Sequence, residues 1–455
     1  MDRKRSTFSG KLGFVLSAAG ASVGLGNIWR FPYLAAKYGG GIFLLIYVIL
    51  ALTFGYTMIV AETSIGRASG KSPVGAFRAF SDSRIMHAGG WLNAVISILI
   101  VPYYSVIGGW VLRYLFAFAH EDMNLIAQES FFTSFLAEGW TGEFWFLVFS
   151  AASLGVIILG VKNGIEKVSG IMMPLLVVMA VIICVYTVTR PGAIEGVKYF
   201  LIPDFSRFSW MTVVSAMGQM FYSLSISMGI LITFGSYMKK EVSIDDSTRQ
   251  VEIFDTGIAM LAGLKIIPAV FAFSGADAAN DLNAGPSLMF ITMPRIFASL
   301  PMGRVIAAIF FLMIFFAALT SSIALCECAV STFSDEFGWS RRKGTAIMGG
   351  IILFLGTLSC LGYGPLSSFR VIGMQFLDFF DFLTNSLMMP VSALAICVLV
   401  VKYMSVERVE EEVTALGGPF RRREVFRFMI SHVCPVFAVI ILLSSLASAF
   451  GIVSF

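Results

Sequence analysis

The chain has 455 residues, of which 57% are hydrophobic and only 13% are charged, and its formal net charge is +4. Ordinary soluble domains carry about 25% charged residues, so this composition excludes a soluble fold. The mean hydropathy of +0.85 predicts a protein that lies in the lipid bilayer, and nothing in the sequence indicates a nucleic-acid partner.

Eleven apolar stretches follow one another along the chain. Each is long enough to cross a membrane as a helix, which requires roughly 20 residues. The sequence therefore predicts an all-α membrane protein with a single transmembrane domain over residues 1–455. The stretches cover residues 12–36, 41–62, 89–118, 142–160, 165–189, 212–238, 252–274, 301–333, 343–362, 379–402 and 425–449.

Basic residues gather in every second connection between these stretches. Because such residues mark cytoplasmic loops, we expect the N-terminus in the cytoplasm, and the odd number of spans then places the C-terminus outside the inner cell membrane. The residues are Arg3, Lys4, Arg5, Arg67, Lys71, Arg78, Arg84, Lys239, Lys240, Arg341, Arg342, Lys343, Lys402, Arg421, Arg422 and Arg423.

The first stretch is interrupted at membrane depth by Gly20, Gly24, Gly26 and Asn27. Glycines and a polar amide weaken a helix. Two glycines four residues apart also fit a close contact between helices. The Asn27 amide, the Gln219 amide and a matching break in the sixth stretch together favour a binding site over simple packing.

The sixth stretch carries a matching interruption, with Ser223, Ser225 and Ser227 between Gly218 and Gly229. The two breaks occupy corresponding positions in two five-helix halves. Paired breaks of this kind indicate a transporter, because freed backbone groups and helix ends there bind the substrate and its coupling ions.

Four ionisable residues, Glu62, Asp255, Lys265 and Glu327, lie inside or near the apolar stretches. Such groups are costly in a membrane and often functional. Glu62 and Glu327 either pair with polar backbone or serve the site. Lys265 either extends to the membrane surface or pairs with an acid.

The cysteines and histidines form no reactive pattern. All six cysteines lie in apolar stretches, where thiols usually pack as small hydrophobic groups. Cys326 and Cys328 lack the second pair of ligands that is typical of zinc sites. We expect neither an enzyme nor a disulfide framework.

Residues 19–33 read AGASVGLGNIWRFPY and precede three glycines at 39–41. This sequence resembles the first-helix motif of the neurotransmitter:sodium symporter family. The resemblance covers essentially the whole chain, and the eleven spans are similar to the short bacterial branch. Further matches lie at Glu62, 66–67, 102–104, 218–225 and 317–322.

The resemblance implies the LeuT fold, with two inverted five-helix repeats at 12–189 and 212–402 and an accessory helix at 425–449. It also implies a sodium-coupled symporter that imports neutral L-amino acids by alternating access, as a monomer or weak homodimer. The implied substrate-binding residues are Ala21, Ser22, Leu25, Gly26, Ile100, Tyr104, Tyr222, Ser223, Ser225, Ser227, Met228, Ser321 and Leu325.

Two sodium sites follow from the same resemblance. The first corresponds to Ser22, Asn27, Ser223 and Asp255, together with the substrate carboxylate. The second corresponds to Gly20, Val23, Ala317, Thr320 and Ser321.

The resemblance also implies two gates. Arg30 and Asp381 match the outer gate, where Asp378 could substitute for Asp381. Arg5 and Asp335 match the cytoplasmic gate, which Ser236 and Tyr237 support, and Phe8 replaces the usual tryptophan beside Arg5.

Several positions depart from the commoner family pattern. The family's chloride ligands correspond to Tyr47, Gln219 and Ser223, but the fourth position is Ala259. Asp255, where many relatives have asparagine, supplies a fixed negative charge. We therefore predict transport without chloride, with Asp255 exchanging a proton. Gly24 stands where monoamine carriers have aspartate, which favours amino acids.

Two alternatives are weighed against this hypothesis. A proton-coupled or exchanger-type carrier would replace the second sodium site with a basic residue, whereas this chain has the hydroxyls of Thr320 and Ser321. A channel would show a ring of repeated pore residues, and a receptor would carry an appended soluble domain.

Overall fold

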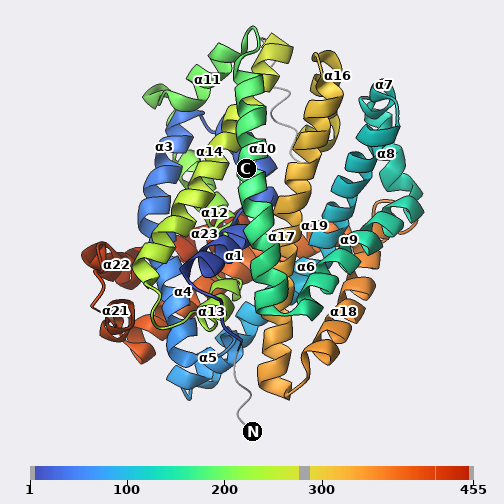
Figure 1. Cartoon of the computed structure of the whole chain (residues 1–455). Coiled ribbons are helices and arrows are strands. Elements are labelled where there is room, and N and C mark those ends of the chain that lie inside the picture. The colour runs from blue at the N-terminus through green and yellow to red at the C-terminus, as the bar shows by residue number, and fades with distance from the viewer. Residues whose placement is uncertain (1–5, 276–286, 416, 450–455) are drawn as a thin grey trace.

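The computed structural model describes residues 6–275, 287–415 and 417–449, and most of these residues lie in helices (Figure 1). Within them, nine helices are long and apolar enough to cross a membrane. They are Gly41–Ser69, Arg84–His120 (α6), Trp140–Leu159 (α9), Val161–Val188, Ile244–Ser274 (α14), Gly303–Phe337 (α17), Arg341–Leu361 (α18), Phe376–Met404 and Arg423–Ala447.

Four of these nine spans contain a π-helical segment, η, between or beside α-helices. The second apolar stretch consists of α3 (Gly41–Leu50), η2 (Ala51–Gly55) and α4 (Tyr56–Ser69). The fifth consists of η3 (Val161–Glu166) and α10 (Lys167–Val188). The tenth consists of α19 (Phe376–Asp381), η7 (Phe382–Met388), α20 (Met389–Val398) and η8 (Leu399–Met404), and the eleventh of α22 (Arg423–Phe428), η9 (Met429–Val433) and α23 (Cys434–Ala449).

The first and sixth apolar stretches are the two that break. The first forms α1 (Lys11–Ser22), then η1 (Gly26–Arg30) and α2 (Phe31–Lys37), and the two parts are bent by 57°. The sixth forms α12 (Trp210–Ser223) and α13 (Ile230–Gly235), which are each too short to span alone. Every predicted stretch thus coincides with a helix or a broken helix, and the predicted all-α membrane fold is confirmed.

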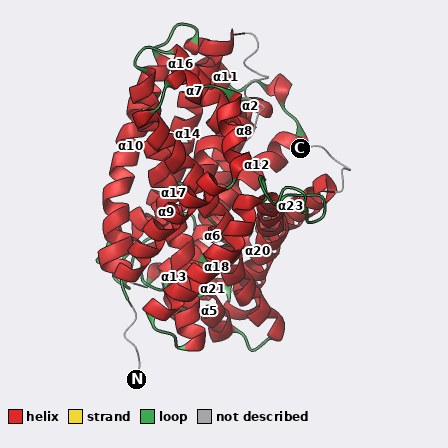
Figure 2. Cartoon of the chain, turned by 90° about the vertical axis from the view of Figure 1, so that its right-hand side faces the viewer, coloured by secondary structure: helices red, strands yellow, loops and turns green. Residues whose placement is uncertain are grey.

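Short helices cover the two ends of the bundle. Figures 1 and 2 show α7 (Met123–Ile126), α11 (Ala193–Leu201) and α16 (Met293–Ser299) near the upper end, with α8 (Glu129–Glu138) below α7 in Figure 1. They show α5 (Pro73–Phe80) and α21 (Val406–Thr414) near the lower end, together with the N-terminus. The long helices α6 and α17 pack against each other and are largely buried.

The segment after the tenth span forms an arginine clasp, defined here by Arg67, Arg421 and Arg422 with their acidic partners. Arg67 of α4 binds Glu412, with Nε 2.6 Å from Oε1. Arg421 lies 3.2 Å from a buried carboxylate, Asp245, and Arg422 lies 2.9 Å from Glu252. Because a buried charge is costly unless it is paired, these contacts hold the segment against α4 and α14.

Glu410 of α21 strengthens the same region. Burial opposes its ionisation, but hydrogen bonds from Arg427 and Arg423 outweigh this effect, so the pKa of Glu410 lies below its ordinary value. The carboxylate is therefore charged at neutral pH and fixes α21 to the start of the eleventh span.

Phe8 packs at the lower end of α1. Its side chain is 1% exposed, and its backbone N–H donates to the carbonyl of Tyr237 at 3.1 Å. Its ring makes edge contacts with Phe14, Phe234 and Tyr237 at centroid distances of 5.9, 5.5 and 6.0 Å. The aromatic cluster ties the N-terminal segment to α13.

Lys265 is fully buried in α14, so its side chain does not extend to the membrane surface. Its Nζ lies 3.2 Å from the sulfur of Met313 and 5.8 Å from the ring centroid of Phe310. None of the ion pairs found within the described residues includes Lys265. Among the described residues, Lys265 therefore neither reaches the membrane surface nor pairs with an acid.

Candidate substrate and ion site

The two broken helices meet at their breaks. The hydroxyl of Ser22 donates to the carbonyl of Leu224 at 3.3 Å, and the hydroxyl of Ser225 donates to the carbonyl of Ala21 at 2.9 Å. Ser225 and Ser227 have positive φ angles of 51° and 64°, which non-glycine residues seldom adopt. The chain therefore leaves helical geometry here and exposes backbone polar groups to the other break.

A pocket lies between the breaks, and eleven of the thirteen residues expected to bind substrate line it. The other two are Ser223 and Ser227, which do not. The backbone N–H of Ser227 instead donates to a carboxylate oxygen of Glu62 at 2.6 Å. Glu62 thus pairs with polar backbone in the break before α13, which is one of the two roles considered for it.

Two glycines keep this pocket open. An added Cβ at Gly24 would lie 2.9 Å from the hydroxyl oxygen of Ser321 and 3.0 Å from that of Tyr104, and one at Gly26 would overlap the ring of Tyr222. The free space is about 20 Å³. Side chains around the pocket must therefore move outward before a larger molecule fits.

The carboxylate of Asp255 is fully buried beside the pocket and accepts hydrogen bonds from three segments. Asn27 Nδ2 lies 2.7 Å from Oδ1, the Tyr47 hydroxyl 3.2 Å from Oδ2, and the Ser223 hydroxyl 3.1 Å from both oxygens. Asn27 also donates to Ser223 at 2.8 Å. Three of the four residues expected at the first sodium site therefore lie together, whereas the Ser22 hydroxyl points to Leu224.

The five residues expected at the second sodium site bring neutral oxygens together from α1 and α17. The Ser321 hydroxyl lies 3.2 Å from the carbonyl of Gly20 and 3.5 Å from that of Val23. The Thr320 hydroxyl lies 3.2 Å from the carbonyl of Ala317. Hard oxygen ligands of this kind suit an alkali cation better than a soft transition metal.

A vestibule of about 430 Å³ opens above the pocket, lined by Trp29, Trp110 and Phe132 among others. Tyr222 lines both spaces and so lies between them. Arg30 and Asp381 also line the vestibule, but no ion pair joins them among the residues that the structure describes. The Arg30 guanidinium lies over the Tyr222 ring, 5.2 Å from its centroid.

Asp381 is instead held by Tyr103 and Asn385. The Tyr103 hydroxyl lies 3.3 Å and the Asn385 Nδ2 2.5 Å from the same carboxylate oxygen. Neither residue was predicted to belong to the gate. Tyr103 stands in the motif at 102–104, but no spacing rule connects that motif to the tenth span.

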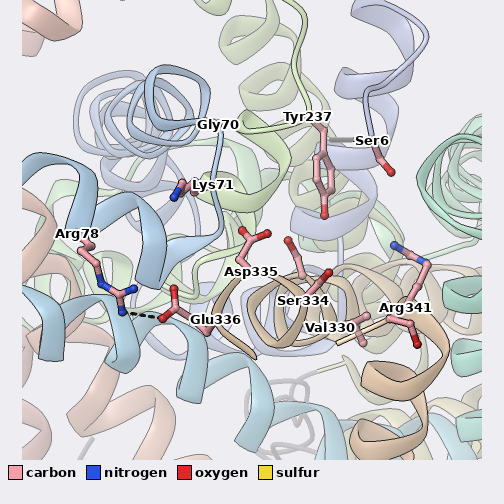
Figure 3. Close-up of a pocket in the computed structure, with 12 residues that line it drawn as sticks. Ser6, Gly70, Lys71, Arg78, Tyr237, Val330, Ser334, Asp335, Glu336 and Arg341 are labelled. Carbon is pink, nitrogen blue, oxygen red and sulfur yellow. Dashed lines mark hydrogen bonds and ion pairs between the residues drawn. The ribbon is translucent and has the colours of Figure 1, made fainter. Parts of the chain in front are cut away.

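A second pocket, of about 500 Å³, lies at the lower end of the bundle (Figure 3). Asp335 lines it and accepts a hydrogen bond from the backbone N–H of Ser72 at 2.7 Å. Arg5, its expected partner, lies outside the described residues. Arg341 and Tyr237 both bind Glu327, with the Tyr237 hydroxyl at 2.7 Å. Glu327 therefore pairs with side chains rather than with backbone.

Comparisons with known proteins identify relatives along the whole chain. The family described as the sodium:neurotransmitter symporter family matches residues 5–129 and 141–452. The uncharacterized sodium-dependent transporter YhdH of Bacillus subtilis is 34% identical over 402 residues, which are 88% of each chain. Sodium- and chloride-dependent GABA transporter 2 of Macaca fascicularis is 28% identical over 81% of this chain and 68% of its own length.

A solved structure shows the same architecture. The crystal structure of MhsT in complex with L-phenylalanine is similar with a TM-score of 0.87 and 32% identity, and the match covers 97% of this chain and 100% of that one. The similarity confirms the predicted LeuT fold.

Proposed function

Since the chain belongs to the sodium:neurotransmitter symporter family, we propose that it couples the inward movement of sodium to the uptake of a neutral L-amino acid. It is a multi-pass membrane protein and a sodium-dependent transporter. The lining of the pocket carries the proposal for the substrate: among the described residues it consists of backbone, hydroxyl, amide and apolar groups without a charged side chain. The L-phenylalanine bound to MhsT supports the same substrate class.

The two ends of the pocket differ in polarity, which suggests how an amino acid would lie. Its carboxylate would face the N-terminal end of the η1–α2 helix and the Tyr104 hydroxyl, because backbone N–H groups and the helix dipole favour an anion there. Its side chain would lie against Ile100, Met228 and Leu325. Tyr222 would move outward to make room.

Two sodium ions fit this arrangement. One would bind the neutral oxygens of Gly20, Val23, Ala317, Thr320 and Ser321. The other would bind beside Asp255, Asn27 and Ser223, where the substrate carboxylate would complete its coordination. Sodium and substrate would then raise each other's affinity, because coupling between two binding sites is reciprocal.

Chloride would not be required. The Tyr47 hydroxyl and Ser223 are already bonded to the Asp255 carboxylate, so the groups that would hold an anion are occupied. A second anion beside a fixed carboxylate would be repelled, by several kcal/mol at ~4 Å and an effective dielectric of about 20. We infer that Asp255 takes up a proton on the return step, so that a proton leaves as sodium enters.

The distribution of basic residues supports a cytoplasmic N-terminus in the inner cell membrane. The vestibule would then face outward and the pocket at Asp335 inward. Alternating access would open these two spaces in turn. The protein would act as a monomer or weak homodimer.

Binding assays on the purified protein test this function. We expect a screen of the twenty amino acids and common amines, with L-phenylalanine as the first probe, to show sodium-dependent binding of neutral amino acids. Equal binding in sodium and potassium buffers would contradict sodium coupling. Tight binding of tyramine or dopamine without competition from any amino acid would contradict the substrate class.

A further inference from the structure

Asp381 lines the vestibule and has two possible kinds of partner there, neutral hydrogen-bond donors and the guanidinium of Arg30. In the structure its Oδ1 accepts hydrogen bonds from Tyr103 at 3.3 Å and from Asn385 at 2.5 Å. Arg30 lines the same vestibule but lies over the ring of Tyr222. Asp381 is therefore bonded to Tyr103 and Asn385, whereas Arg30 contacts Tyr222.

The contacts on the acid side are built into the fold. Tyr103 of α6 is 1% exposed, and its hydroxyl also lies 3.3 Å from the Thr384 hydroxyl and 3.4 Å from Asn385 Nδ2. Asn385 and Asp381 are four residues apart and so lie on one face of the tenth span. The four polar side chains of Tyr103, Asp381, Thr384 and Asn385 form one network between the third and tenth spans.

We propose that Tyr103 and Asn385 are positioning residues that hold Asp381 away from Arg30 and so favour the open outer gate. The proposal rests on the function proposed above, in which the vestibule faces outward. A bidentate contact with arginine requires both oxygens of a carboxylate, and two neutral donors already occupy one of them. A bidentate contact between Arg30 and Asp381 would therefore compete with these donors.

The hydrogen bonds from Tyr103 and Asn385 to Asp381 are weak enough to break when the outer gate closes. Neutral donors bind a carboxylate less strongly than a guanidinium does, so Arg30 can displace them when the gate closes. Arg30 rests on Tyr222, which also lines the substrate pocket. A substrate that moves Tyr222 therefore also moves Arg30, and so shifts the competition for Asp381. The bonds from Tyr103 and Asn385 delay closure of the outer gate until the pocket is filled.

A thiol reporter in the pocket tests this proposal without a known substrate. Ile100 is 2% exposed and lines the pocket below Tyr222, so a membrane-impermeant thiol reagent reaches Ile100→Cys from outside only through the gate. In sodium buffer without substrate, Tyr103→Phe is expected to slow labelling by roughly three- to tenfold, because the closed population rises. Asn385→Ala is expected to act in the same direction.

Three controls separate this effect from misfolding. The parent chain without Ile100→Cys measures labelling of the native cysteines. In an Asp381→Asn background, Tyr103→Phe is expected to have no further effect, because the charge that Arg30 binds is gone. Tyr363→Phe removes a similar bond, from the Tyr363 hydroxyl to Asp378 at 2.8 Å in the same vestibule, and is expected to leave the rate unchanged.

Uptake measurements add a second readout. Loss of the hold is expected to raise KM for a transported amino acid, because the outer-closed population cannot bind it from outside, whereas a general packing defect would lower only the amount of active protein. Unchanged labelling in both Tyr103→Phe and Asn385→Ala, or an equal slowing in the Asp381→Asn background, would overturn the proposal. A larger effect of Tyr363→Phe would move the role to Asp378. Failure of sodium-dependent uptake in the unmodified protein would overturn the proposed function instead.

Discussion

The two candidate sodium sites lie close to the same helix break but are built from different chemistry. The site at Thr320 and Ser321 offers only neutral oxygens, drawn from α1 and α17. The site at Asn27 and Ser223 contains the buried carboxylate of Asp255. A neutral site can release its ion without leaving a buried charge behind, whereas the carboxylate must find a proton or another cation. From this contrast we expect the neutral site at Thr320 and Ser321 to contribute most to sodium stimulation, and Asp255 to balance the charge of the bound ions.

The largest effect is expected at the neutral site. Replacing Thr320 and Ser321 with alanine removes both hydroxyl ligands, so sodium should no longer stimulate binding. Ser322→Ala is a matched control, because its buried hydroxyl has no hydrogen-bond partner in this site. Binding assays in sodium and potassium measure the difference. Normal sodium stimulation in the double variant would remove this site from the coupling mechanism.

A smaller effect is expected at the charged site. Asp255→Asn keeps the shape of the side chain but removes its charge, and it should weaken sodium-dependent uptake by roughly ten- to a hundredfold, the range for a hydrogen bond to a charged group.

The pH dependence of the same variant is informative. In the unmodified protein, protons and sodium compete for the Asp255 carboxylate, so the apparent sodium affinity should rise as pH rises. The asparagine variant cannot bind that proton and should lose this dependence. Uptake measured across pH at several sodium concentrations tests the point, and normal kinetics in the variant at every pH would contradict the proposed role of Asp255.

Gly24 connects the neutral site to the substrate pocket. A methyl group there would press on Ser321 and Tyr104 at about 3 Å, so Gly24→Ala should weaken amino-acid binding by about tenfold, the order expected from overpacking. Gly218→Ala is the control, since an added Cβ there meets no atom within 4 Å. Equal binding by the two variants would show that the pocket is roomier than this structure indicates.

No effect at all is expected when gluconate replaces chloride. The carboxylate of Asp255 already supplies the negative charge, and Ala259 one turn away offers no hydroxyl to an anion. Uptake should be unchanged by the exchange in the unmodified protein. A strict chloride requirement would mean that Asp255 does not balance the sodium charge.

Local composition was sufficient to predict the helices and their breaks. The glycines and serines that weaken the first and sixth apolar stretches lie where α1 and α12 end, because a helix cannot tolerate many such residues without a compensating contact. The apolar length of each stretch likewise reflects the thickness of the membrane. These signals depend only on residues that are neighbours in the chain, so they can be recognised in a single sequence.

The contacts of individual side chains could not be predicted in the same way. Ser227 was expected in the pocket, but its positive φ and the bond from its N–H to Glu62 turn it elsewhere. Tyr103 meets Asp381 across 278 positions of the chain, and neither periodicity nor charge pattern encodes that pairing. Such contacts depend on how distant helices pack.

The arginine clasp has a mechanical consequence for the transport cycle. Salt bridges connect the lower ends of α4 and α14 to the segment that follows the tenth span. They are formed by Arg67, Arg421 and Arg422. Sliding these parts past one another would strand the buried carboxylates of Asp245 and Glu252, at a cost of several kcal/mol for each unpaired buried charge. We therefore expect these parts to move together during transport, with the bending at other places in the chain. We expect bending at the breaks after Ser22 and Ser223, because the regular helices α1 and α12 end there.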